Sequence, residues 1–416
     1  MSEISVTFKS VLIGLAEEAA GPAGPLLGLL MDVLFPEKTL NVWDEIKDEV
    51  EKLVGEKIED ATYQHAKDHL KGIHNDLARF TEVREKSHDN ESIRTNFNIC
   101  LQNLLLVQPI LMDKKDAKIL APLLAQFANL HLALLREGVK LGDSWGFSSD
   151  DIELFYSGPQ GLKNQITGYT KWVNQNAPYN PPLHWPKSLV TPFETSPTSW
   201  NGKNAAARFN ALKVNDVAYF WPFFDVRKYP KGNDVKRPDR EIYFGVASGN
   251  GYLYNAPQFG LTIDNSKKER ISGIEIFAHD RIDGFRCRFG PTLVPGPIVG
   301  TPNRSGSTDT DGGTTTKPFG YHSSLLGHDI VSIDAWYGSD TGGNLCNTSL
   351  NTVVFHVNVA GWSTPQLQNY EWGHKVIYSQ EEHVLSNIYA GGGLHADKGC
   401  GAGFVVFGFR YRASYD

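Results

Sequence analysis

The hydrophobic pattern of the chain contains two long uncharged segments separated by a short charged one. No charged residue occurs in 95–112 or in 119–135, and five charges lie in 113–118. Each uncharged segment would reach roughly 25 Å as an α-helix, which is the short end of what spans a hydrocarbon core. The pattern predicts a helical hairpin with a polar turn. Such a hairpin is either the buried centre of a helical bundle or a segment that enters membranes.

The predicted hairpin also contains uncharged polar residues in both segments. The buried core of a bundle is the ordinary explanation of an apolar helix such as 119–135. In a closed bundle, each buried polar group must find a hydrogen bond or cost about 1–3 kcal/mol. The polar residues also suit a helix that is enclosed by protein in one state and faces a water-filled pore in another. The candidate membrane-insertion residues are Asn98, Gln102, Gln108, Leu120, Leu124, Phe127, Asn129, His131 and Leu134.

Before residue 230, apolar residues recur at helical spacing. Ser148 and Asp151 resemble a capping box that opens a helix over 152–173, which the Gly-Pro pair at 158–159 must interrupt. Gly142 suits a left-handed stop for the helix of the second uncharged segment. The first part of the chain is therefore predicted to be helical.

Beyond residue 230, apolar residues alternate with polar ones, as in strands with one buried face. The alternating segments are 274–276, 285–289, 331–335 and 353–357, followed by a last expected strand over 405–411. Glycine and proline are dense between Gly290 and Gly320, where we expect a mobile loop. The second part of the chain is therefore predicted to be all-β and antiparallel.

The composition describes a globular protein long enough for two domains. The chain has 416 residues, of which 41% are hydrophobic and 21% charged, and its formal net charge is −7. This acidic balance argues against nucleic acid as a main partner. Glu17 and Glu18 break the apolar run near the N-terminus, so we expect no signal peptide.

The sequence lacks the short motifs that identify common enzyme classes. It contains no nucleophile elbow, P-loop, HExxH, paired-cysteine motif or dinucleotide fingerprint. His65, His69 and His74 lie in a polar helical segment and are more simply explained as part of a solvated face than as ligands. We therefore expect neither an enzyme nor a bound metal or cofactor.

Several strings before residue 245 are similar to one protein family. The segment 120–137, LAPLLAQFANLHLALLRE, resembles the central fifth helix of the Cry δ-endotoxins. Further similar strings, in the order in which that family has them, are GPAGPLLGLL (21–30), WGFS (145–148), FWPFFDVRKYP (220–230) and REIY (240–243). The resemblance covers most of 10–245 and is specific to the first domain of these toxins.

This resemblance implies a seven-helix bundle with a central hydrophobic helix. Helix four would be 95–112, and helix five would be 117–140. In the family, this hairpin swings out of the bundle into a target-cell membrane and forms an oligomeric, cation-permeable pore. A full three-domain toxin continues with a β-prism and then a β-sandwich, whereas 246–416 suffices for one β domain.

The second part of the chain is similar to a jacalin-type β-prism, with a β-sandwich as the alternative. Jacalin-like lectins bind sugar with a Gly-x-x-x-Asp loop before the final strand, and Gly393 and Asp397 have that spacing. Glycines in this segment equally suit a tight turn that binds nothing. The candidate carbohydrate- or receptor-binding residues are Tyr389, Gly391, Gly393, His395 and Asp397.

We thus expect an α+β multidomain protein, with a helical domain over 1–230 and an all-β domain over 231–416. The resemblance implies an insecticidal pore-forming toxin that binds a surface glycan or glycoprotein receptor, oligomerises and inserts its hairpin among target-cell lipids. It would be held in the cytoplasm or an inclusion of the producing cell and act outside that cell after release. The two-part layout also resembles the larger subunit of Pir-type binary toxins, which implies a second toxin subunit.

Two other functions remain open at this point. The first is a carbohydrate-binding lectin whose helical domain is an assembly scaffold without pore activity. The second is an intracellular structural or regulatory protein built from a toxin-like bundle. Vesicle leakage and glycan binding, measured on one preparation, distinguish these functions from a toxin.

Overall fold

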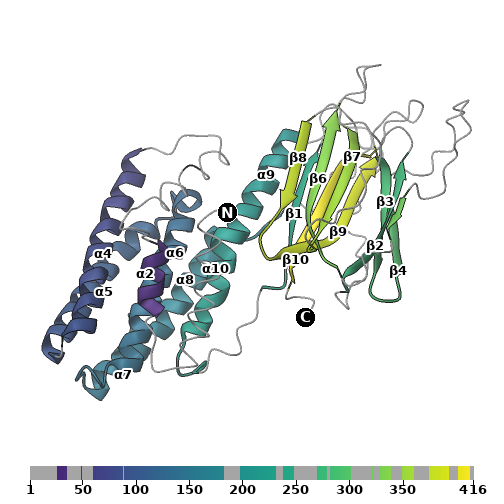
Figure 1. Ribbon diagram of the computed structural model, residues 1–416. Helices are drawn as coiled ribbons and strands as arrows, with labels where there is room; N and C mark the ends of the chain where they lie inside the picture. Colours follow the sequence, from purple (N-terminus) through teal and green to yellow (C-terminus); the bar gives the residue numbers. More distant parts are fainter. Residues whose placement is uncertain are drawn as a thin grey trace, which may run out of the picture. The chain divides into compact units, whose positions relative to one another are not determined.

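The fold of the chain, given by a computed structural model, consists of two units that differ in secondary structure (Figure 1). One unit comprises Met1–Asn180 and Phe209–Lys236, and the other comprises Pro181–Arg208 and Arg237–Asp416. The domain boundary at residue 230 stays a prediction. The residues that the structure describes are 26–34, 48, 60–87, 89–181, 197–230, 238–247, 269–278, 282–300, 320–322, 328–338, 349–359, 374–392 and 402–412.

The described part of the first unit is helical, as its sequence predicts. Its elements are α2 (Leu26–Leu34), α4 (Asp60–Lys86), α5 (Asn90–Leu111), α6 (Ala117–Leu141), α7 (Ser149–Ser157), α8 (Leu162–Asn176), the π-helix η2 (Ala211–Asn215), α10 (Asp216–Phe220) and the 3₁₀ helix η3 (Trp221–Phe224). Helices α5 and α6 confirm the predicted hairpin. The helix expected over 152–173 is divided into α7 and α8, because the chain leaves the helical path at Gly158 and Pro159.

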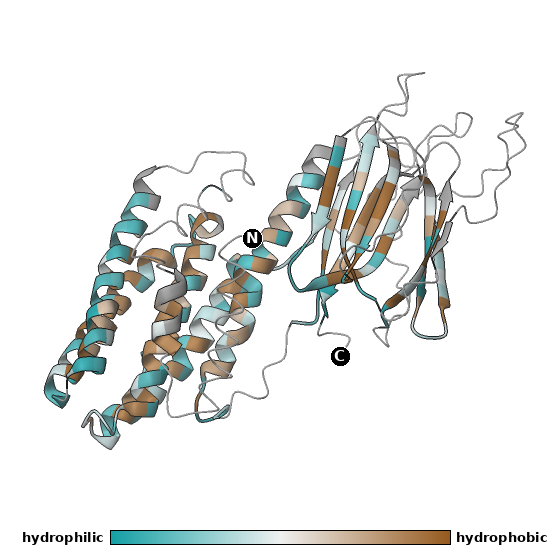
Figure 2. Ribbon diagram, viewed as in Figure 1, coloured by the Kyte–Doolittle hydropathy of each residue, from teal (hydrophilic) through white to brown (hydrophobic). Residues whose placement is uncertain are grey.

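Helix α6 is the centre of this unit, as predicted for the helical bundle. Every residue from Leu120 to Gly138 is buried. Helix α6 packs against α2, α5, α7, α8, α10, η2 and η3. Figure 2 contrasts the mostly hydrophilic α4 with the more hydrophobic helices of the same unit. The large apolar surface of α6 is thereby removed from water, which supplies the main stabilisation of the bundle.

The junction between α6 and α7 confirms one local prediction and corrects another. The Ser148 hydroxyl accepts from the Asp151 N–H, and the Asp151 carboxylate accepts from the Ser148 N–H, so the capping box is confirmed. The left-handed stop predicted at Gly142 is wrong, because its φ is −55° and its ψ is −38°. A Cβ on Gly142 would overlap the backbone oxygen of Gly138 and lie 2.9 Å from Ile152 Cγ1, so glycine is favoured there by both the end of α6 and the packing against α7. The left-handed conformation belongs to Gly146, with φ of +78°.

The second unit contains antiparallel strands and most of helix α9 (Pro197–Asn210). The last two residues of α9, from Phe209, belong to the first unit. The strands are β1 (Glu241–Ala247), β2 (Ile271–Ala278), β3 (Ile282–Phe289), β4 (Val294–Gly300), β5 (Gly320–His322), β6 (Ile330–Gly338), β7 (Ser349–Val357), β8 (His374–Ser379), β9 (His383–Gly392) and β10 (Ala402–Tyr411). The described sheets have the strand orders β1-β10-β9, β4-β3-β2-β5 and β7-β6-β8. Three sheets favour a β-prism over a two-sheet sandwich, and the choice between them stays a prediction.

The alternation that predicted β3 corresponds to the two faces of this strand. Phe285, Cys287 and Phe289 are buried, whereas Arg286 and Arg288 between them are half-buried. Successive side chains of a strand point to opposite sides of the sheet, so the apolar residues enter the core together. The predicted all-β, antiparallel character is confirmed for the described strands.

Strand β4 corrects the expectation of a mobile loop throughout 290–320. Val294 pairs with Phe289, and Pro295 pairs with Arg288 of the neighbouring strand β3. In the described sheet, β4 lies at the edge and has β3 as its partner. Proline is tolerated in an edge strand because the N–H that it lacks would face away from the sheet. The remainder of the expected loop, 301–319, lies outside the described residues.

Candidate functional site

The ends of hairpin α5–α6 are formed by local side-chain interactions. The Asp89 carboxylate caps α5 by accepting from the backbone N–H groups of Glu91 and Ser92, at 3.1 and 3.2 Å. The residues of the turn at 113–115 are exposed to solvent. The hairpin therefore presents its charges at the turn, as the sequence predicts.

Helix α5 buries one face, and its opposite face is exposed and uncharged from Thr95 onward. Its buried residues recur at steps of three and four: Ile93, Phe97, Cys100, Leu104, Val107 and Leu111. The predicted site residues Asn98 and Gln102 are exposed on the opposite face. On that face Ile99 and Leu106 are 44% and 70% exposed. From Thr95 onward, the outer surface of α5 thus combines amide and apolar side chains without charge.

The predicted apolar site residues of α6 are enclosed by the bundle. Leu120, Leu124, Phe127 and Leu134 are each at most 1% exposed. Within the described residues, one helix is long and apolar enough to cross a membrane, over Ile119–Leu141, and 94% of its most apolar stretch is buried. The core helix of a bundle that never enters a membrane has the same composition. Burial of α6 is therefore compatible with a permanent core helix and with a helix that later enters a membrane.

The polar site residues of α6 contact aromatic side chains of neighbouring helices. Trp221 Nε1 donates to Asn129 Oδ1 at 2.9 Å. His131 Nδ1 lies 2.7 Å from the Tyr169 hydroxyl. Within the described residues, Gln126 Nε2 and His131 Nε2 are buried without a hydrogen-bond partner. These side chains fix α6 in its position but leave part of its hydrogen-bonding capacity unused.

Side-chain amides fasten α5 to two other helices. The Asn103 amide donates to Asp76 Oδ2 of α4 at 2.7 Å. The Gln108 amide, a predicted site residue, donates to Gln165 Oε1 of α8 at 2.6 Å. Gln108 is half-buried and differs in this respect from the exposed Asn98 and Gln102. Release of α5 from the bundle requires that both hydrogen bonds break.

A buried ionic group lies at the C-terminal end of α6. Arg136 donates to the backbone oxygen of Phe224 at 3.0 Å. Glu137 Oε2 lies 2.6 Å from Arg84 Nη1, and Glu137 Oε1 accepts from the Leu27 N–H at 3.2 Å. The hydrophobic pattern ended at residue 135 and assigned no role to these side chains. Two adjacent charged residues directly after a long uncharged helical segment were the signal in the sequence that could have indicated a buried ionic group.

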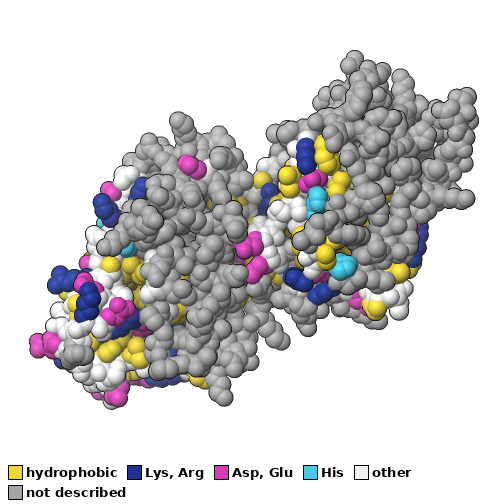
Figure 3. All heavy atoms as spheres, viewed as in Figure 1, with side chains coloured by type: hydrophobic (Ala, Val, Ile, Leu, Met, Phe, Trp, Pro, Cys, Tyr) yellow, Lys and Arg dark blue, Asp and Glu magenta, His cyan; other side chains and the backbone are white. Residues whose placement is uncertain are grey.

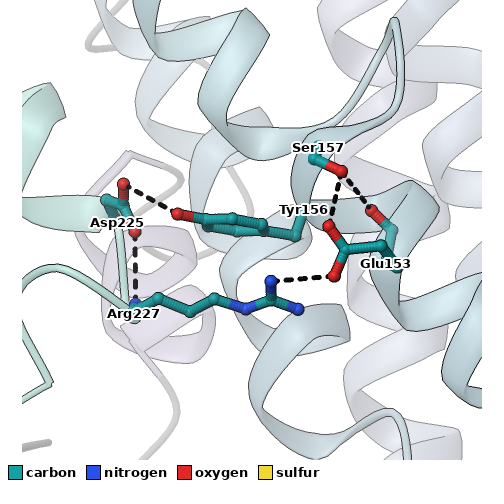
Figure 4. Close-up of polar contacts among 5 residues, drawn as sticks. All are labelled: Glu153, Tyr156, Ser157, Asp225 and Arg227. Carbon is teal, nitrogen blue, oxygen red and sulfur yellow. Dashed lines mark hydrogen bonds and ion pairs between the residues drawn. The ribbon is translucent and has the colours of Figure 1, made fainter.

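A second polar cluster joins α7 to the segment that follows η3 (Figure 4). The Arg227 guanidinium lies 2.8 Å from Glu153 Oε2 and stacks on Tyr156, 3.9 Å from the ring centroid. The Ser157 hydroxyl donates to Glu153 Oε1 at 2.6 Å, and the Tyr156 hydroxyl donates to Asp225 at 3.4 Å. Hydrogen bonds from Ser157 and Arg227 lower the pKa of the Glu153 carboxyl. These contacts join α7 to the segment that follows η3, and no imidazole among the described residues of the cluster is placed to activate Ser157.

The structure describes only part of the predicted carbohydrate site. Tyr389 is buried, and its hydroxyl donates to Glu241 Oε2 at 2.7 Å. This side chain therefore supports the interior of the sheet, and its placement does not favour sugar contact. Gly391 lies in β9, where it pairs with Phe404 of β10. The predicted residues Gly393, His395 and Asp397 lie outside the described residues.

The described residues offer no metal site with three or more protein ligands. No group of three or more His, Cys, Asp or Glu side chains among them has the arrangement that would hold one. On the face drawn in Figure 3, basic and acidic side chains are interspersed over the helical unit. The described side chains on this face therefore form no large patch of one charge sign.

Comparison with known proteins places the helical part of the chain in a family. The model of the delta endotoxin N-terminal domain matches residues 12–225. The pesticidal crystal protein Cry1Id of Bacillus thuringiensis is 28% identical over 340 residues, covering 74% of this chain and 45% of the relative. Cry26Aa of Bacillus thuringiensis subsp. finitimus is 28% identical over 246 residues, covering 55% of this chain and 20% of the relative. The chain spans less than half the length of these two relatives.

Similar solved structures extend the comparison to the fold of the whole chain. Insecticidal delta-endotoxin Cry8Ea1 from Bacillus thuringiensis has a TM-score of 0.70 at 19% identity, covering 99% of this chain and 74% of that chain. PirB has a TM-score of 0.64 at 12% identity, covering 98% of this chain and 94% of that chain. The order of a helical bundle followed by β-sheets is thus shared with these folds. Because the family model matches about half of the sequence, the chain belongs to the family of the delta endotoxin N-terminal domain.

Proposed function

We propose that this chain is an insecticidal pore-forming toxin that inserts hairpin α5–α6 into a target-cell membrane. The observation that carries the proposal is α6, whose segment Ile119–Leu141 is long and apolar enough to span a bilayer and is enclosed by other helices. The family adds support, because its matched relatives are named pesticidal crystal proteins. No step of this activity requires a catalytic residue.

The free-energy terms favour insertion by an assembly rather than by one hairpin alone. About a dozen apolar residues of α6, at about −0.3 to −0.6 kcal/mol each, supply about 4–7 kcal/mol. Each charge in the turn at 113–118 costs about 2.5–3.5 kcal/mol at the bilayer centre. Several hairpins around a water-filled pore would keep the turn hydrated during its passage. We therefore propose that the chain oligomerises at the membrane surface.

A water-filled pore would also accommodate the polar residues of the hairpin. Asn98 and Gln102 already face solvent on α5. Asn129 and His131 of α6 would exchange their contacts within the bundle for contacts with water or with other copies. In this proposal the uncharged polar residues allow both the closed and the inserted state. They can face water in a pore, and their transfer into lipid costs less free energy than that of charged residues.

We further propose that the β unit binds the target cell through a surface glycan or glycoprotein receptor. The residues proposed for this contact are Gly391, Gly393, His395 and Asp397, without the buried Tyr389. The chain would accumulate as an inclusion in the producing cell and act on other cells after release. The likeness of fold to PirB over nearly the full length of both chains motivates the proposal of a second toxin subunit.

A reversible cross-link tests whether α5 must leave the bundle. Asp76→Cys and Asn103→Cys place thiols at a contact between α4 and α5, where the native side chains are 2.7 Å apart. A cleavable bismaleimide joins them in a background where Cys346 and Cys400 are serine. The cross-linked protein should release no dye from vesicles of insect midgut brush-border membrane. Reductive cleavage of the linker should restore release, which shows that the protein remained folded.

The matched control carries the same linker within one helix. Lys86 Nζ lies 2.9 Å from Glu82 Oε1 on the exposed face of α4, so Glu82→Cys and Lys86→Cys can be joined without tying helices together. This variant should release dye as the uncross-linked protein does. Undiminished release by the protein linked between positions 76 and 103 would contradict insertion of the hairpin.

The same preparation distinguishes a toxin from a lectin with a helical scaffold. A lectin would bind a glycan array or agglutinate cells, but it would release no dye whether the linker is intact or cleaved. Dye release that depends on brush-border glycoprotein would support both parts of the proposed function.

A further inference from the structure

Two histidines on helix α4 direct the same ring nitrogen at each other. His65 and His69 are four residues apart, which places them on one face of the helix. Their Nε2 atoms are 3.3 Å apart, and their ring planes make an angle of 83°. His65 is exposed and His69 is half-buried. In this conformation one ring donates its Nε2 proton to the Nε2 atom of the other, and a metal ion would take the place of that proton.

The distance between these nitrogens matches the requirement of a tetrahedral metal ion. Zinc–nitrogen bonds of about 2.0–2.1 Å at the tetrahedral angle place two nitrogens about 3.3 Å apart. Neutral imidazole is a preferred ligand of zinc, copper and nickel. We propose that His65 and His69 form a two-imidazole site for Zn²⁺ or a similar divalent transition metal, with water in the remaining coordination positions.

The helix surface one turn beyond His69 is open at Gly72. Gly72 follows His69 by three residues on the same face, and a Cβ on Gly72 would meet no atom within 4 Å. The Asp68 carboxylate next to His69 adds negative charge, although it accepts from the Gln64 amide at 2.8 Å. Binding should contribute to the stability of α4, because the ion joins two successive turns.

This proposal differs from the expectation of no metal site in the polar helix. The spacing of the histidines in the sequence does not fix their side-chain rotamers, and the structure supplies that missing information. Only two ligands are involved, in agreement with the absence of a group of three among the described residues. The site is therefore expected to bind a metal reversibly rather than to hold it permanently.

Calorimetric titration of the full chain with ZnCl₂ at pH 7.5, after dialysis against EDTA and then buffer, tests the proposal. Loss of an indirect contact to a metal already costs about 10–100-fold in affinity, so His65→Gln and His69→Gln should each weaken binding by about tenfold or more. The matched control is His74→Gln, five residues from His69 on another side of α4. This variant should keep the affinity of the original protein.

A gain of affinity provides the second arm of the test. Gly72→His adds an imidazole one turn beyond His69, where space is open, and should tighten binding by about tenfold or more. Gly72→Ala controls for the change in helix propensity and should leave zinc affinity unchanged. Circular dichroism verifies that α4 remains helical in every variant. Equal affinity of the original protein and both glutamine variants, or of Gly72→His and Gly72→Ala, would overturn the proposal.

Discussion

Among the residues of α6, His131 shows how one directed contact fixes a polar side chain in the core. His131 and Tyr169 are both fully buried, and the His131 Nδ1 atom lies 2.7 Å from the Tyr169 hydroxyl. The other ring nitrogen has no partner among the described residues. A buried polar atom without a partner costs about 1–3 kcal/mol. The tyrosine hydroxyl therefore helps to hold α6 in the closed bundle.

The change Tyr169→Phe should lower the free energy of unfolding by about 1–3 kcal/mol, because His131 loses this contact while the aromatic packing stays. Urea unfolding followed by circular dichroism measures the change. The double variant His131→Leu/Tyr169→Phe should cost less than the sum of the single variants, since both polar groups are removed together. Strict additivity would show that the two side chains do not interact in solution.

Some residue roles were predictable because they depend on local chemistry, and others were not. Ser148 and Asp151 satisfy each other within one helical turn, so four letters of sequence suffice to predict the capping box. The role of Gly142 depends in part on the close approach of Ile152 from another helix. Tyr389 likewise meets Glu241, which is distant in sequence. Local patterns carry no information about such partners.

At the scale of elements, helices α2, α4 and α6 meet at one buried carboxylate. The Glu137 side chain is 3% exposed and lies 2.6 Å from Arg84 of α4, whose side chain is 12% exposed. The same carboxylate accepts the Leu27 N–H at the start of α2. This contact therefore links three helices more strongly than surface pairs do. Without Glu137, the half-buried Arg84 would keep the exposed Glu85, 3.6 Å away, as an acidic partner.

The change Glu137→Ala should destabilise the protein by about 1.5–3 kcal/mol, because Arg84 and the Leu27 N–H lose a charged hydrogen-bond acceptor while Arg84 keeps Glu85 at 3.6 Å. Glu82→Ala is the matched control on α4, since it removes an exposed pair with Lys86 and should cost less than about 1 kcal/mol. Chemical denaturation of both variants measures the difference. Equal costs would show that the buried carboxylate does not join the helices in solution.

Elements with strong periodicity were predictable, and elements of irregular composition were not. The long uncharged segments correctly predicted α5 and α6 as two successive helices. A helix buried on one face has apolar residues at helical spacing, and a helix buried on all sides has a continuous uncharged segment. Strand β4 was missed because Pro295 and Pro297 are typical of loops. They are tolerated there because β4 lies at the edge of its described sheet.

At the scale of the whole molecule, the change from helices to strands was predictable, whereas the pairing of strands was not. Strand β1 pairs with β10, with Glu241 opposite Arg410, near the other end of the chain. Alternation indicates which face of a strand is buried but not which strand lies beside it. The resemblance to known families predicted the helical bundle and favoured a β-prism, whereas the strand order within each sheet followed only from the structure.

The proposed function assigns target recognition to the β unit and membrane entry to the helical unit, so either can be lost alone. Asp397→Ala should weaken glycan-array binding by about tenfold or more, since hydrogen bonds to a charged group contribute about 1.5–3 kcal/mol. At high concentration, this variant should still release dye from receptor-free vesicles. The protein cross-linked between positions 76 and 103 should show the reverse, binding glycan without release. If Asp397→Ala abolished both activities while remaining folded, the two units would not act separately.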